Sequence, residues 1–408
     1  MDRSALISLI EASKEAEPSS LTDLLFHTTN PELHGEDAAL AWAILEFFKS
    51  DEWVQSLDIH DNRYVENNKE KYIVDLPSLA AWTAWLVRAE ADVAKAVDTL
   101  FRFLNTGQAS ATSYLLLGGL WSVKQTELPP DMCLARFEDF KPSRYAGELL
   151  ALTEVKAFSG LDRPRCVLSM NHKVEGLVLS PQQQSERDNN WALFCFDRGA
   201  RDDMAAIAEC LCLIGPHPMI RVLDWCEIDT RTAPPGLELD AHVGLVRMPY
   251  PTFMDGEDFS ASRCRELVDA FRRLPTNLRR KVLVPIRRLN GAMRALPGWD
   301  EVDWAIGLGI ALEALLVDES KGERPSNTIP RKGADILIEG DETRRADIER
   351  KLKRVYALRS AAMHSGTITS QDAREALTAG TLFAASLIRH EVLQLAILPH
   401  DSPRTAFD

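Results

Sequence analysis

The sequence predicts a mostly helical protein with a small α/β or α+β domain in its middle. Helical regions at both ends of the 408-residue chain place apolar residues at intervals of three and four positions, the spacing that makes one face of a helix apolar. Between them lie short runs rich in β-branched and aromatic residues, a pattern typical of strands. Because a chain of this length exceeds one typical core, we expect domains at residues 1–125, 126–255 and 256–400.

The first predicted domain is helical and strongly acidic. Helical spacing of apolar residues occurs at 4–16, 37–50, 78–104 and 110–123. Residues 1–100 contain 19 Asp and Glu against 8 Lys and Arg, a net charge of −11. Such a surface repels nucleic acid. We therefore expect a sensing or regulatory role here, with a regulatory or antitoxin protein as partner.

The second predicted domain begins where paired prolines at 129–130 interrupt the helical pattern. One helix is expected at 201–215. The expected strands are 165–170, 174–180, 191–198, 219–228 and 242–250. A turn-rich, acidic segment at 249–260 then ends the domain.

The third predicted domain is a helical bundle. Its expected helices are 260–274, 276–296, 301–317, 343–364 and 370–397. Pro285 predicts a kink or break in the second of these. The third is apolar nearly all round, which indicates a buried helix. Thr369 and Asp372 form a capping-box pattern before the last.

The sequence lacks the motifs that mark several classes of enzyme. The chain has no Walker loop, no H-E-x-x-H, no G-x-G-x-x-G and no G-x-S-x-G. Cys210, Cys212, Cys226 and His217 carry side chains that can bind a metal, but residues two apart on a helix point in different directions, so we expect neither a metal nor a cofactor. The seven cysteines include no C-x-x-C pair and are expected to be reduced.

The sequence shows neither a signal-peptide pattern nor a long apolar segment, and both bear on where the protein is found. The first twenty residues lack the basic start and apolar block of a signal peptide. Apolar runs stay well short of the roughly 20 residues that a membrane span needs. We expect a cytoplasmic protein that does not contact a membrane.

The candidate chemistry centres on Arg359, at a position that the helical period assigns to a buried face. The stripe runs Ile348, Leu352, Val355, Arg359, then Ala362 and Met363. A buried guanidinium needs a partner, because an uncompensated buried charge costs several kcal/mol. Glu313 is the best candidate within the chain, and a ligand phosphate is the other.

His364 lies five residues after Arg359, about 140° further round an ideal helix. The two side chains would line one cleft only if the helix end were distorted. The helix macrodipole favours the protonated imidazole while a nearby arginine opposes it, so His364 is a candidate for proton transfer near neutral pH. The alternative is that Arg359 and Glu313 form a structural ion pair and His364 only caps the helix.

The stretches "DWAIGLGIALEALL" and "KLKRVYALRSAAMHSG", with basic helices before and a long helix after, resemble the Apea-like branch of the HEPN superfamily. Those proteins carry helical bundles with an arginine, four to six intervening residues and a histidine. The resemblance covers about 260–398. It implies a HEPN-type bundle, and a metal-independent RNA endonuclease that acts as a homodimer through this bundle and serves in phage defence, toxin or stress systems.

Carried over by position, the resemblance makes Arg359 and His364 the catalytic pair, Arg359 at the scissile phosphate and His364 as proton carrier. Glu313 would support the arginine. Ser360 stands where many active members have an asparagine or aspartate. The alternative from another class is a non-catalytic HEPN module that binds RNA or mediates dimerisation.

A basic stretch stands out in this acidic chain. The net charge is −14 overall, but 261–300 contains ten Lys and Arg against three Asp and Glu. It is interpreted either as a solvated helix face or as a track for RNA phosphates. The candidate RNA-binding residues are Arg279, Arg280, Lys281, Arg287 and Arg288.

Overall fold

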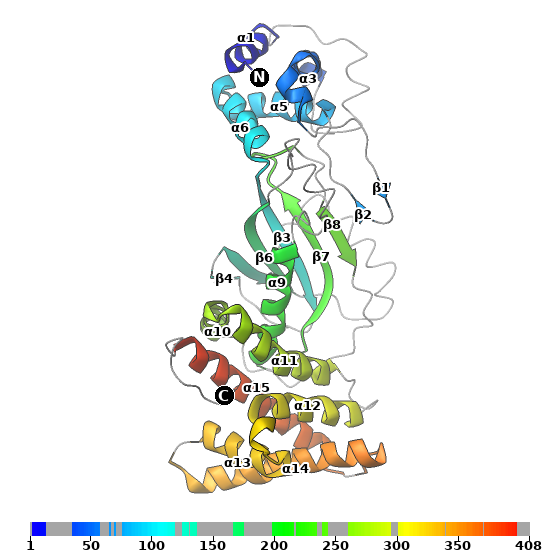
Figure 1. Cartoon of the computed structure of the whole chain (residues 1–408), viewed down its shortest axis with the longest axis vertical. Coiled ribbons are helices and arrows are strands. Elements are labelled where there is room, and N and C mark those ends of the chain that lie inside the picture. Colours follow the sequence, from blue (N-terminus) through cyan, green and yellow to red (C-terminus); the bar gives the residue numbers. More distant parts are fainter. Residues whose placement is uncertain are drawn as a thin grey trace. The chain divides into compact units, whose positions relative to one another are not determined.

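The computed structural model describes the helices and strands that Figure 1 labels. The described residues are 2–13, 35–57, 65–66, 69–70, 76–118, 125–129, 131–136, 166–174, 198–215, 218–234, 239–243, 260–294, 301–338, 340–369 and 371–397. Helices dominate these ranges and accompany a small sheet, as predicted.

The chain forms two compact units, and each is assembled from separate pieces of sequence. The first contains Met1–Tyr114, Met170–Arg201 and Trp225–His242. The second contains Leu115–Ser169, Asp202–Asp224 and Val243–Asp408.

Helices of the first unit bury an apolar core. They are α1 (Arg3–Ser13), α3 (Gly35–Ser50), α4 (Glu52–Gln55), α5 (Leu76–Glu90) and α6 (Val93–Thr106). Trp82 is fully buried, meets Phe103 edge to face, and donates its indole N–H to the Thr230 carbonyl at 2.6 Å. The expected single helix at 78–104 is two helices, because Ala91 takes a left-handed φ of 52° and Asp92 then caps α6 by accepting from the Lys95 N–H.

A six-stranded sheet has the order β4-β5-β6-β3-β7-β8. Its strands are β3 (Ala109–Gly118), β4 (Thr126–Leu128), β5 (Met132–Arg136), β6 (Cys166–Val174), β7 (Ile220–Ile228) and β8 (Leu239–Val243). β4 and β5 pair antiparallel, with Leu128 opposite Met132. A separate two-stranded ribbon consists of β1 (Val65–Glu66) and β2 (Lys69–Glu70).

The expectation of a helix at 110–123 was wrong where the structure describes this segment, because it contains strand β3. Ala109, Ala111 and Ser113 are buried while the residues between them are more exposed. That alternation has the two-residue period of a strand. Ser, Thr and Tyr in this stretch also favour a pleated, half-buried surface over a helix. Of the expected middle strands, 174–180 (beyond Val174), 191–197 and 244–250 lie outside the described residues.

The second unit contains the C-terminal helices. These are α9 (Arg198–Cys210, its residues from Asp202 onward), α10 (Ala261–Arg273), α11 (Thr276–Arg294), α12 (Glu301–Leu316), α13 (Pro325–Leu337), α14 (Glu342–Ser365) and α15 (Ala373–Ile397), with short 3₁₀ turns η3 (Leu211–Leu213) and η4 (Glu319–Lys321). Of the kink or break expected at Pro285, the break does not occur, because α11 continues through this residue. Helix α15 begins only at Ala373, so Thr369 lies too far upstream to cap it.

Glycines allow the other helices to approach α14 closely. A methyl group at Gly333 of α13 would lie 2.7 Å from Leu352 Cδ1, and one at Gly380 of α15 would lie 2.6 Å from Val355 Cγ2. Leu352 and Val355 are both fully buried. These contacts are tighter than ordinary packing permits for any residue with a side chain. The absence of side chains at Gly333 and Gly380 therefore allows α14 to pack closely against α13 and α15.

One carboxyl is buried in this unit without a hydrogen-bond partner. Glu391 of α15 is 6% exposed, and its Oε1 has no partner among the described residues. Burial raises the pKa of Glu391, because desolvation disfavours the ionised form. The folded state consequently holds this proton more tightly than the unfolded state does.

Replacing Glu391 with methionine should stabilise the protein at pH 8, by about 1–3 kcal/mol, because it removes an unpaired buried polar group. The pKa of Glu391 is higher in the folded state than in the unfolded state. Its ionisation therefore costs no stability at a pH below the unfolded-state pKa, and this cost appears as the pH rises through the folded-state pKa. The gain should therefore shrink towards pH 4. Urea unfolding at several pH values measures it, with exposed Glu375→Met on the same helix as control; an equal gain at all pH values would contradict the assignment.

Candidate functional site

Glu313 of α12 receives hydrogen bonds on both carboxylate oxygens. The Arg359 guanidinium donates through Nη2 to Oε2 at 3.0 Å, and the Tyr356 hydroxyl donates to Oε1 at 3.1 Å. The arginine and glutamate side chains are 22% and 23% exposed. The contact expected between Arg359 and Glu313 is confirmed, and it is a partly desolvated, charge-assisted pair.

Tyr356 was missed by the sequence analysis, although its spacing could have revealed it. It precedes Arg359 by three residues, so both side chains project from the same face of α14. The guanidinium carbon lies 5.5 Å from the centre of the tyrosine ring, within cation–π range. Burial raises the pKa of Tyr356, and the neighbouring Glu313 raises it further. The phenol therefore remains a proton donor towards the carboxylate.

Gly309 provides the space for the Arg359 side chain. A methyl group at Gly309 would lie 3.0 Å from Arg359 Cβ and overlap Cγ. Gly309 is one helical turn before Glu313, so the same face of α12 supplies both the space for the stem and the counter-charge for the head. Arg359 Nε is buried with no hydrogen-bond partner among the described residues. The guanidinium is thus held by Glu313 through Nη2, and its Nε–H makes no hydrogen bond to the described residues.

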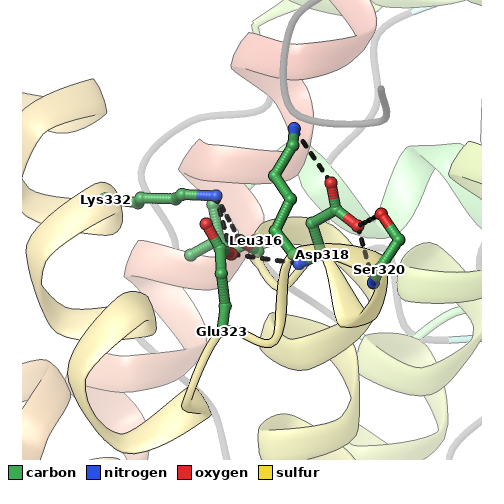
Figure 2. Close-up of polar contacts among 6 residues, drawn as sticks. Leu316, Asp318, Ser320, Glu323 and Lys332 are labelled. Atoms are coloured by element: carbon green, nitrogen blue, oxygen red, sulfur yellow. Dashed lines mark hydrogen bonds and ion pairs between the residues drawn. The ribbon is translucent and has the colours of Figure 1, made fainter.

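A polar cluster fixes the end of the helix that carries Glu313 (Figure 2). Lys332 donates to the Leu316 carbonyl at 3.1 Å and to Glu323 at 2.9 Å, and Glu323 accepts from the Asp318 N–H at 3.1 Å. These bonds satisfy a carbonyl that the end of α12 leaves free. Glu323 and Lys332 therefore hold the turn after Glu313.

Asp318 completes this cluster on its other side. Its carboxylate accepts from the backbone N–H and the hydroxyl of Ser320, and Lys321 lies 2.9 Å away. Hydrogen bonds from Ser320 and from Lys321 lower the pKa of Asp318 to about 2. The carboxylate is therefore ionised at neutral pH.

His364 is exposed in the last turn of α14, and the helix stays regular there. The Gly366 N–H donates to the Ala362 carbonyl at 3.1 Å, and Gly366 ends the helix with a left-handed φ of 66°. The distortion that would turn Arg359 and His364 to one side is absent, so they stay about 140° apart round the axis. Met363 is 54% exposed, so its expected place on the buried stripe was wrong.

Ser360 and the basic candidates occupy different surroundings. Ser360 is half-buried beside Arg359. Arg279 is turned inward, where it donates to the carbonyls of Leu274 and Arg272 and lies 3.6 Å from Asp203 of α9. The remaining candidates are exposed on α11: Arg280, Lys281, Arg287 and Arg288.

Three of the four residues considered as metal ligands are described by the structure, and His217 lies outside the described residues. Cys210 and Cys212 are buried and free, whereas Cys226 Sγ lies 3.9 Å from His172 Nε2 on a neighbouring part of the sheet. His172 Nε2 also lies 2.9 Å from the hydroxyl of buried Ser113. No group of three metal-ligating side chains occurs among the residues that the structure describes. In those same ranges, no helix has the length and apolarity needed to cross a membrane.

Comparisons with known proteins give no relative for this chain. No family model, curated protein or solved structure matches it significantly. The function must therefore be argued from the site itself.

Substituting Gly309 with alanine should destabilise the second unit by about 1–3 kcal/mol, the usual cost of an added methyl in a filled contact, because the new methyl overlaps the Arg359 stem. Gly291→Ala on α11 is the matched control, since a methyl there meets nothing within 4 Å. That change should be neutral or stabilising by up to about 1 kcal/mol. Chemical denaturation measures both, and equal effects would contradict a packed contact at Gly309.

Tyr356→Phe should cost about 1–2 kcal/mol, because it removes one of two donors to the Glu313 carboxylate. A double-mutant cycle with Glu313→Gln tests the contact itself. We expect the two losses to be clearly less than additive, since each substitution breaks the same hydrogen bond. Additive losses would mean that the hydroxyl stabilises the fold by another route.

Proposed function

We propose that this protein is a metal-independent RNA endonuclease of HEPN type whose reactive groups are Arg359 and His364. The observation that carries the proposal is the state of the arginine. Its guanidinium is anchored at one edge by Glu313, yet the side chain remains 22% exposed. An anchored cation that is partly exposed is suited to stabilise charge developing on a phosphate.

The reaction needs no redox agent, metal or cofactor. The RNA 2′-oxygen attacks the adjacent phosphorus, the bond from phosphorus to the 5′-oxygen breaks, and the products are a 2′,3′-cyclic phosphate and a 5′-hydroxyl. The 2′-hydroxyl proton is lost and a proton is gained by the leaving oxygen. His364, exposed at the helix end, is the group proposed to carry this proton.

The angular separation of the pair supports a dimer. Arg359 faces α12, whereas His364 lies about 140° away round the same helix. We propose that a second copy completes each reaction centre at the C-terminal bundle, so that the arginine and the histidine meet RNA from two sides. The acidic N-terminal region would then supply regulation in a defence or toxin system.

A non-catalytic RNA-binding or dimerisation module is the second candidate. The observation that favours it is the double hydrogen bonding of Glu313 by Arg359 and Tyr356, which would stabilise the bundle with no substrate. This alternative expects Arg359→Ala to unfold or loosen the unit, because a partly buried carboxylate loses its counter-charge. The nuclease proposal expects activity to fall further than stability.

The proposal is tested by incubating the full-length protein with structured and unstructured RNA in EDTA and mapping the product ends. Wild type should cut and leave 2′,3′-cyclic phosphates, and His364→Ala should lose cleavage by at least about 100-fold, within the range of general acid–base catalysis. His390→Ala is the matched control, an exposed histidine on α15. Retained cleavage by His364→Ala would overturn the assignment, as would equal losses in both variants.

A further inference from the structure

The exposed face of α11 carries its cations between Arg280 and Arg288, about half the length of the helix. An ideal helix turns 100° per residue, which places its exposed cations within an arc of about 120°. These residues, here called the α11 cationic face, are Arg280, Lys281, Arg287 and Arg288. Arg287 bonds Glu209 of α9 at 2.7 Å but is still 57% exposed.

One exposed apolar residue lies between the cations of the α11 cationic face, and a glycine follows them. Val284 is 49% exposed, and Gly291 falls on the same arc with nothing within 4 Å of a methyl group placed there. From Arg280 to Arg288 the helix rises about 12 Å at 1.5 Å per residue. The face is therefore an elongated, open strip, long enough to meet more than one phosphate of an extended strand.

The cations of α11 lack acidic neighbours on their own helix. Residues 276–294 contain six Lys and Arg and no Asp or Glu. Helix α14 is different, because Asp347 pairs with both Arg350 and Lys351, and Glu349 pairs with Lys353. Like charges on one helix face destabilise it. Glu209 of α9 offsets the charge of Arg287, and an anionic ligand on this face would offset the charges of Arg280 and Arg288.

The charge of the chain is divided along the sequence. Residues 261–397 contain 23 Lys and Arg against 18 Asp and Glu, a net of +5, and the rest of the chain has a net of −19. An acidic protein that binds RNA needs a local region of positive charge for attraction. Helix α11 is the part of this region with no acid of its own.

We propose that the α11 cationic face binds the phosphate backbone of single-stranded RNA without reading its sequence. This inference rests on the proposed function, which makes RNA the substrate. It places the part of the RNA strand outside the reaction centre along α11. Arg279 is excluded from the path, because its guanidinium is used inside the bundle. The face lacks aromatic anchors typical of protein interfaces and the broad apolar side of a membrane-binding helix, so a polyanion fits it best.

The test measures equilibrium binding of a fluorescent single-stranded RNA to the full-length protein in EDTA at several salt concentrations. The binding variant is the triple Arg280→Gln, Lys281→Gln, Arg288→Gln. The matched control is the triple Arg344→Gln, Arg350→Gln, Lys351→Gln on α14, which removes the same charge from cations that lie beside acids. Circular dichroism and thermal unfolding verify that both variants fold.

Losing three phosphate contacts should make the slope of log K against log salt less steep by about 2. This corresponds to a loss of roughly 100-fold in affinity near 0.1 M salt. The control should change the slope by less than half as much, and different RNA sequences should be affected equally. Unchanged binding by the α11 variant, with cleavage intact, would overturn this inference and leave the proposed nuclease standing. Absence of both binding and cleavage in wild type would overturn both.

Discussion

The second unit depends on how one carboxylate is neutralised inside a bundle of apolar helices. Glu313 lies on the largely buried helix α12, where an ionised group is costly unless its charge and both oxygens are satisfied. Arg359 provides the charge and Tyr356 provides the second donor. Because both donors come from α14, this requirement also sets the rotation of α14 about its own axis. The rotation in turn decides which side chains of α14 are buried and directs His364 outward.

The bundle combines this electrostatic constraint with a steric one. Gly309, Gly333 and Gly380 belong to three different helices, and each leaves room for one side chain of α14. Glycine in a helix interior weakens the helix by roughly 0.5–1 kcal/mol relative to alanine. The close contacts that these glycines permit offset that loss through dispersion and burial. Helix α14 is fixed in translation by the glycines and in rotation by Glu313, so Arg359 has little freedom to adopt another position.

Much of this arrangement was predictable from sequence, and the failures have physical reasons. The pairing of Arg359 with Glu313 followed from a charge on a buried stripe, because burial demands a counter-charge. Strand β3 is difficult to recognise from sequence because three consecutive leucines make its second half apolar without alternation, and the alternation typical of a strand is confined to its first half. The break at Ala91 depends on a left-handed residue that composition does not reveal. Helix α13 contains Pro325, Pro330 and Gly333, residues that discourage a helix assignment; tertiary packing against α14 overrides that preference.

The interleaving of the two units has a consequence for how the protein reaches its folded state. The chain passes between them five times, at 114–115, 169–170, 201–202, 224–225 and 242–243. The Asn290 side chain of α11, for example, bonds both the N–H and the carbonyl of Met219, 71 positions earlier. Contacts at such sequence separations require large loops to close before any energy is gained, which slows folding. During synthesis the first unit cannot be completed before residue 242 has emerged, and the second cannot be completed before its last piece, Val243–Asp408, has emerged. The earlier pieces of the second unit, Leu115–Ser169 and Asp202–Asp224, would therefore keep apolar surface uncovered until most of the chain had been made.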